Sequence, residues 1–336
     1  MKRLLFSILI VCLLLPVVVI GQTNTTAKLS KEKAGAIDQP TGKIAFIREK
    51  NLWAMNWNGT DQFKVVTAEN ASGKLSWSPD GKSIAFCRFG LADLKGPDHL
   101  GGKHKVWDIF VGYLDSAIAD TPNTNWWRRL TFDLGGRFPE WVRDDDKILF
   151  TKDLNANFLN ALEPNYQACF MDSVGENFKI IRADWQNSEK HMLMPTLGHD
   201  NKYAFVLVEG VTPAGIVISS LDIKSMTKES VSGMKFISKA TAPAWSPDGQ
   251  WIAYVLTAMD DQGIYITDPD LKEKYLIYKP GVGQTMQTYP LSWAPDSKWL
   301  TFALGDGSIW IIDITGNNLR MVIGPGTNEA PAWSQH

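Results

Sequence analysis

The sequence predicts an all-β protein, a six-bladed β-propeller of four-stranded blades. Three observations carry this prediction. A short motif that forms a turn recurs along the chain, further apolar strands follow each copy of it, and the two chain ends hold complementary halves of one copy. The 27 glycines and 17 prolines are spread from end to end and interrupt every long helical pattern after the first twenty residues.

The recurring motif begins with an apolar residue or proline, then a variable residue and then Trp. The next position is Ser or Ala, and it is followed by Pro, Asp and Gly. A polar residue then leads into an alternating apolar strand. Its clearest copies span residues 75–86, 243–254 and 291–302. Proline presets the first turn position, aspartate caps the turn, and glycine takes the left-handed position before the next strand. The motif therefore predicts a β-hairpin.

Weaker copies occur at residues 139–150 and 195–205, and a last copy begins at residue 330. Each copy has one large apolar side chain at the same position, which we expect to pack between neighbouring blades. These anchors are Trp77, Trp141, Leu197, Trp245, Trp293 and Trp333. A third and a fourth apolar strand follow most hairpins, as at residues 51–56 and 63–67, which completes a blade.

The chain ends complement each other. Residues 330–336 are the first half of the motif, and residues 42–46 are its second half. We therefore expect the C-terminal strand to become the inner strand of the N-terminal blade, because closure of the ring removes unpaired strand edges.

The N-terminus predicts export. Lys2 and Arg3 precede an uninterrupted apolar run from Leu4 to Ile20. We interpret residues 1–21 as a signal peptide, with an uncleaved membrane anchor as the alternative, residues 22–41 as a disordered linker, and residues 42–336 as the propeller. The expected location is periplasmic or secreted.

Composition excludes other classes. A net charge of -2 with 21% charged residues argues against a nucleic-acid partner. We expect contact with a membrane only if the N-terminal segment is uncleaved, and we expect a monomer. Cys87 and Cys169 are predicted to be buried small apolar residues, with a disulfide between them as the alternative.

The Trp-Ser-Pro-Asp-Gly-Lys hairpin at residues 77–82 and its copies resemble the repeats of the TolB-type propeller family, relatives of the WD-repeat class. The resemblance covers residues 42–336 and implies a protein-binding role in the cell envelope. It is incomplete, because TolB carries a sizeable α/β domain before its propeller, and here only residues 22–41 stand in that place.

Enzymatic activity is the less favoured interpretation. No Gly-x-Ser-x-Gly motif of a serine peptidase occurs in the chain. The alternative is a metal-dependent polysaccharide lyase or hydrolase with its site at the channel mouth, using His99, His104, His191 and His199 with Asp98 and Glu163. No two of these histidines have the spacing of ligands on one strand or helix, so we expect surface loops, with no metal and no cofactor.

The candidate binding site lies on two enlarged connections, between Arg88 and Val106 and between Lys152 and Ala168. Long insertions without regular structure are uncommon unless they are disordered or bind something. We expect a protein or saccharide ligand in the cell envelope to contact this region. The candidate ligand-binding residues are Asp98, His99, His104, Glu163, Tyr166, Trp185 and His191.

Overall fold

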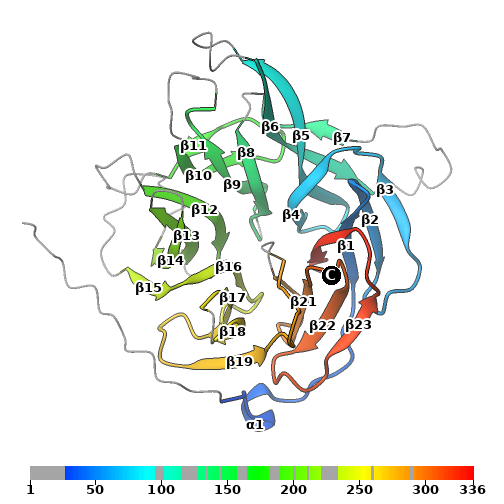
Figure 1. Ribbon diagram of the computed structural model, residues 1–336, viewed down its shortest axis with the longest axis vertical. Helices are drawn as coiled ribbons and strands as arrows, with labels where there is room; N and C mark the ends of the chain where they lie inside the picture. Colours follow the sequence, from blue (N-terminus) through cyan, green and yellow to red (C-terminus); the bar gives the residue numbers. More distant parts are fainter. Residues whose placement is uncertain are drawn as a thin grey trace, which may run out of the picture.

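The computed structural model shows a ring of blades around a central channel (Figure 1). The structure describes residues 27–94, 102–114, 127–132, 135–143, 145–156, 165–181, 190–199, 202–209, 212–220, 234–258, 261–287 and 291–336. Within these ranges the strands form six four-stranded sheets, and every paired neighbour is antiparallel. The predicted six-bladed propeller is confirmed.

Each blade is a sheet whose first strand lines the channel. Blade I contains β24 (Asn328–Trp333), β1 (Lys43–Arg48), β2 (Asn51–Asn56) and β3 (Phe63–Val66). Blade II contains β4 (Ala71–Trp77), β5 (Ser83–Leu94), β6 (Gly102–Tyr113) and β7 (Trp127–Arg129). Blade III contains β8 (Gly136–Trp141), β9 (Lys147–Asp153), β10 (Tyr166–Asp172) and β11 (Lys179–Ile180).

The other half of the ring repeats this order. Blade IV contains β12 (Lys190–Leu197), β13 (Lys202–Glu209), β14 (Thr212–Ser220) and β15 (Lys235–Ser238). Blade V contains β16 (Ala240–Trp245), β17 (Ile252–Leu256), β18 (Gly263–Thr267) and β19 (Lys274–Tyr278). Blade VI contains β20 (Ser292–Trp293), β21 (Trp299–Ala303), β22 (Ile309–Asp313) and β23 (Arg320–Ile323).

The two chain ends meet in blade I. The C-terminal strand β24 pairs antiparallel with β1, with Trp333 opposite Ile44 and Ala332 opposite Ala45. Figure 1 shows the red C-terminal strand beside the blue N-terminal ones. The predicted closure of the ring is therefore confirmed.

Six hydrophobic clusters fill the spaces between adjacent blades. The tryptophan anchors are buried in these clusters, at 2% exposure for Trp77 and 3% for Trp333, and Leu197 is partly buried. Cys87 and Cys169 share the cluster between blades II and III, where both are buried and neither forms a disulfide. Burial raises the pKa of the Cys87 thiol to about 12.

The turns of the hairpins follow the expected chemistry. Gly81 and Gly249 have φ of 68° and 71°, and Ser297 takes the equivalent left-handed position at 59°. In the first hairpin the Ser78 hydroxyl donates to Asp80 Oδ1 (2.6 Å), and this hydrogen bond holds the pKa of Asp80 below its usual value.

The equivalent carboxylate in blade VI behaves differently. Asp296 still accepts a hydrogen bond from the Lys298 backbone N–H (2.8 Å), but Ala294 stands where the first hairpin has its serine. Burial is the dominant effect there and raises the pKa of Asp296. Two carboxylates at one repeat position thus have pKa shifts of opposite sign.

The inner strands contain a repeated irregularity. Phe138, Met194, Ala242 and Ala330 each lie three residues before the anchor of their strand, and Gly73 lies four before Trp77. All five have positive φ, between 51° and 82°. The pairing register shifts at this point in each of their strands, which marks a β-bulge. Apart from Gly73, the sequence gives no local signal for a left-handed residue here.

Part of the expected disordered linker is ordered. From residue 27 onward the chain runs across blades V and VI, and α1 (Lys31–Ala34) lies outside β19 (Figure 1). Leu29 is 2% exposed in the cluster between these blades, and the Trp299 indole donates to the Asp38 carbonyl (3.0 Å). The polar composition of this segment predicted disorder. A few apolar side chains among the polar ones are nevertheless sufficient to dock residues 27–41 on the ring.

The enlarged connection between Arg88 and Val106 is also more regular than expected. β5 and β6 continue as a long hairpin, with Gly90 opposite Val106 and the backbone of Leu94 opposite Gly102. Much of this insertion is therefore strand and not irregular loop. The residues of the predicted signal peptide, and residues 95–101 and 157–164 of the two connections, lie outside the described residues.

Candidate functional site

The two ends of the channel are formed by different connections between strands. The turn that follows each inner strand lies at one end, which we call the hairpin face. The connections between second and third strands, including the extended β5–β6 hairpin, emerge at the other end, which we call the loop face. Every inner strand runs from the loop face to the hairpin face, because the anchor residue ends it just before the turn.

Four side chains from blades II, III and IV meet near the loop face. We call Trp107, Arg137, Tyr166 and His191 the loop-face cluster. The Arg137 guanidinium stacks over Trp107, 3.7 Å from the ring centroid, and lies 5.2 Å from the Tyr166 centroid. The Tyr166 and His191 rings are in edge contact (5.6 Å), and the Tyr166 backbone N–H donates to His191 Nδ1 (3.3 Å).

The electrostatics of this cluster are unbalanced toward positive charge. No carboxylate of the described residues forms an ion pair with Arg137, and its Nε atom is buried without a partner there. The nearby Asp108 is occupied by Arg129 Nη2 (2.6 Å) and the Thr131 hydroxyl (2.8 Å). Burial raises the pKa of Tyr166 and the Arg137 charge opposes that shift, so the phenol remains a neutral donor.

The structure brings together two of the seven residues predicted for the site, Tyr166 and His191. His104 lies in β6 opposite Ala92, on the extended hairpin. The remaining predicted residues, Asp98, His99, Glu163 and Trp185, lie outside the described residues.

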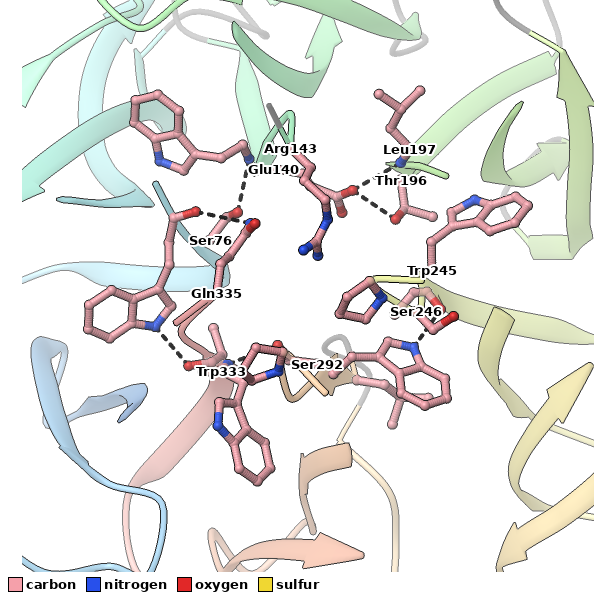
Figure 2. A pocket seen from close by; sticks show the side chains of 18 of the residues that line it. Ser76, Glu140, Arg143, Thr196, Leu197, Trp245, Ser246, Ser292, Trp333 and Gln335 are labelled. Carbon is pink, nitrogen blue, oxygen red and sulfur yellow. Dashed lines mark hydrogen bonds between the residues drawn. The ribbon is translucent and has the colours of Figure 1, made fainter. Parts of the chain in front are cut away.

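A cavity of about 150 Å³ lies in the channel at the hairpin face (Figure 2). Its wall consists of the anchors and the residues beside them on all six inner strands, together with turn residues such as Ser246 and Pro247. Arg143, which follows β8, extends toward the centre of this ring of side chains (Figure 2).

A buried carboxylate joins three blades in the wall of this cavity. Glu140 forms an ion pair with Lys74, and their side chains are 17% and 7% exposed. The other oxygen of Glu140, Oε1, accepts hydrogen bonds from the Thr196 hydroxyl (2.8 Å) and the Leu197 backbone N–H (2.9 Å). Three donors of the protein thus hold this carboxylate, which ties blades II, III and IV together at the channel.

Two of the candidate metal ligands, His191 and His199, lie at opposite ends of the channel. His199 lines the cavity, where its Nε2 lies 2.6 Å from the Pro247 carbonyl, whereas His191 belongs to the loop-face cluster. Among the described residues no group of three or more histidine, cysteine, aspartate or glutamate side chains is placed to hold a metal ion. In the same part of the chain, no helix is long and apolar enough to cross a membrane.

Sequence reasoning missed several residues of both regions. Trp107 and Arg137 lie on different blades, so no local pattern joins them. Glu140 could have been found by aligning the repeats, since it is a charged residue where other copies have serine, threonine or alanine before the anchor. That comparison would have identified the polar wall of the cavity.

The six antiparallel sheets and their order around the channel define a six-bladed β-propeller. No protein-family model and no curated protein sequence matches the chain. Among solved structures, TolB from Acinetobacter baumannii is similar at 17% identity and a TM-score of 0.61, covering 87% of this chain and 66% of that one. This chain therefore spans about two thirds of that protein's length.

Two further structures have the same ring. Putative TolB from Agrobacterium tumefaciens is similar at 12% identity and a TM-score of 0.56, covering 86% of this chain and 92% of that one. A chain of a nidogen/laminin complex is similar at 9% identity and a TM-score of 0.57, covering 86% and 97% of the two chains. At these identities the similarity concerns the fold, and the fold is that of the TolB-like propellers.

Proposed function

We propose that this protein is an exported, non-enzymatic propeller that recognises a protein or saccharide ligand of the cell envelope on its loop face. The observation that carries the proposal is the loop-face cluster beneath the extended β5–β6 hairpin. Export is supported by the basic residues and apolar run at the N-terminus, and a periplasmic or secreted location follows from it.

The composition of the cluster is that of a binding hot spot. Tryptophan, tyrosine and arginine are the residues that most often dominate binding energy at interfaces. The Arg137 guanidinium is stacked between aromatic rings and has no carboxylate partner among the described residues. Such a group can meet an acidic side chain of a protein or the hydroxyls of a sugar without first breaking an ion pair.

The shape of the ring supports the same face. The second and third strands of blade I are joined by Glu49 and Lys50 alone, whereas those of blade II extend far beyond their blade and those of blade III are joined by residues 154–165. Elongated connections on neighbouring blades, positioned by a rigid ring, are a common arrangement for recognition. The strands that follow these two connections, β6 and β10, contribute Trp107 and Tyr166 to the loop-face cluster.

Shortening the extended hairpin tests the proposal. The strands are still paired at Gly90 and Val106, so residues 91–105 can be replaced by an Asn-Gly turn without cutting into the blade. We expect the melting temperature to stay within about 2 °C, while recovery of the ligand that co-purifies with the native mature protein is lost. Undiminished recovery would exclude this face as the binding surface.

A further inference from the structure

We propose that the surface where residues 27–34 dock on blades V and VI is a peptide-binding site. Its partner is a polypeptide segment that presents one apolar side chain and one lysine. We call residues 27–41 the strap, and the first part of the strap is a displaceable occupant of this site. The site lies apart from the loop-face cluster and does not depend on the function proposed above.

An ammonium group is held in an aromatic cage on blade V. The Lys33 Nζ atom lies 5.9 Å from the Trp251 ring centroid and 5.7 Å from that of Tyr275. The two rings meet at an interplanar angle of 74°. Glu273 forms an ion pair with Lys33, and the Tyr275 hydroxyl accepts a hydrogen bond from it (3.4 Å). Aromatic faces and a carboxylate are groups that recognise a primary ammonium, and we call Trp251, Glu273 and Tyr275 the lysine cage.

Two further elements beside the cage fit an apolar side chain and an added backbone. Leu29 is 2% exposed among side chains of blades V and VI, four positions before Lys33. β19 is the outermost strand of blade V (Figure 1), and its Leu276 N–H donates to the Ala27 carbonyl (3.2 Å). An edge strand that pairs with an added backbone, beside sites for individual side chains, is a recurring mode of peptide recognition. The strap therefore shows how a polypeptide binds here.

The two parts of the strap are held differently. In the second part, the Thr41 carbonyl accepts a hydrogen bond from the indole of the buried anchor Trp333 (2.7 Å). In the first part, the side chains of the Lys33–Glu273 pair are 41% and 37% exposed, and exposed pairs contribute little to stability. The helix α1 has four residues and is too short to be stable without the ring. Residues 27–34 can thus detach while the rest of the strap stays in place.

The sequence requirement for another occupant is small. Leu29 supplies the buried apolar contact and Lys33 the cationic one, so a partner segment needs an apolar residue four positions before a lysine. The hydrogen bond to Glu273 raises the pKa of Lys33, so the group in the cage is charged at neutral pH. The Glu273 carboxylate also disfavours an acidic residue at the same position. A basic segment with this spacing therefore competes with the strap.

The test is titration, by fluorescence anisotropy, of a labelled pattern peptide in which Leu and Lys stand four positions apart among Ala and Ser residues. The native protein is compared with Lys33→Gln, which withdraws the ammonium from the cage, and with Leu29→Ser, which withdraws the apolar anchor of the strap. Because the strap competes for the site, the Kd should fall from the native protein to Lys33→Gln to Leu29→Ser, by roughly tenfold or more overall. For Leu29→Ser we expect a Kd on the order of 0.1 mM.

This ranking separates a binding site from a structural role. A strap that only stabilised the ring would create no affinity for an added peptide when its own contacts are removed. The pattern peptide with Gln in place of its Lys should bind roughly fivefold or more weakly, because it loses the contacts with the cage.

Controls locate the effect at the cage. Glu273→Gln, combined with Lys33→Gln, should raise the Kd roughly threefold or more at low salt, and this difference should shrink as salt is added. Glu329→Gln is the matched control, since Glu329 also pairs with a lysine, Lys50, but on blade I, and it should leave the Kd unchanged. Lys33 is an exposed position, so Lys33→Gln should melt with the native protein and keeps the test valid if Leu29→Ser does not fold.

A last comparison identifies the occupant. Binding of a peptide of residues 27–36 without binding of the pattern peptide would assign the site to the strap of this chain or of a second copy, and would overturn the proposal. No binding of the pattern peptide to either strap variant up to about 1 mM would also overturn it. The same conclusion would follow from equal affinity of the native protein and both strap variants, from equal binding of the Lys and Gln peptides, or from an unchanged Kd in the Glu273→Gln combination.

Discussion

Removal of the C-terminal strand is the most informative perturbation of the fold. Deleting residues 330–336 takes away the end of β24, which closes blade I against β1. The deletion leaves β1 with an open edge and empties part of the space between blades VI and I, where Trp333 packs. We expect the whole ring to be destabilised, although the deleted segment is short.

The magnitude follows from the contacts that are lost. Trp333 is 3% exposed, and replacing a buried tryptophan by alanine costs about 3–5 kcal/mol. The deletion also removes the Ala332 carbonyl, to which the Trp77 indole donates (3.0 Å), and the Ser334 hydroxyl, which accepts from the Lys43 N–H (2.8 Å). Hydrogen bonds of this kind contribute about 1 kcal/mol each, so the loss is comparable with the ~5–15 kcal/mol stability of a typical domain.

Thermal unfolding followed by circular dichroism is the assay. At about 2 °C per kcal/mol for a large domain, Trp333→Ala should lower the melting temperature by roughly 6–10 °C, and the deletion should lower it further or prevent folding. Phe132→Ala, at a side chain that is 72% exposed, is the matched control and should change it little. A deletion variant that melts within about 2 °C of the native chain would refute the closure argument.

Three further predictions concern local features. Gly73→Ala should lower the free energy of unfolding in chemical denaturation by about 1 kcal/mol, because Gly73 has a φ of +82° while the space around it is open. Gly324→Ala is the control, since that glycine is also in open space but has no positive φ, and it should be neutral. Equal effects of the two substitutions would contradict the bulge. Asp80→Asn should lower the melting temperature at neutral pH. The pKa of Asp80 is lower in the folded than in the unfolded protein, so the ionised carboxylate stabilises the fold above the unfolded pKa, and this contribution is lost as the pH falls through the folded pKa. Asp296→Asn should not lower the melting temperature at neutral pH, because the raised pKa of Asp296 favours the fold only at low pH. Cys87 should resist alkylation at about pH 8 in the folded protein and react after unfolding, because so little thiolate forms when the pKa is raised; rapid native labelling would show that the thiol is exposed.

The sequence was most informative where structure is encoded locally. Proline, aspartate and glycine specify each hairpin within a few residues, and the complementary halves at residues 42–46 and 330–336 imply closure without any knowledge of the ring. The anchors follow from the same register, because a side chain in a fixed repeat position meets the same neighbours in every blade.

What the sequence did not reveal depends on contacts between distant segments. Phe138 has positive φ because the bulge of the inner strand requires it, and nothing in its neighbours indicates that. The docking of Leu29 depends on a groove that exists only once blades V and VI are packed. Arg137 and Trp107 lie thirty positions apart on different blades, so their stacking is a property of the assembled ring.

The measurement that tests the account most directly is recovery of the ligand by two arginine variants of the protein. Arg137 stacks in the loop-face cluster, and Arg320 stacks over Trp299 at 5.4 Å on blade VI, so Arg320→Gln is a matched control for loss of a stacked guanidinium. We expect Arg137→Gln to reduce recovery of the co-purifying ligand by roughly tenfold or more, with Arg320→Gln binding like the native protein. Equal recovery by both variants, with both folded, would contradict recognition through the loop face.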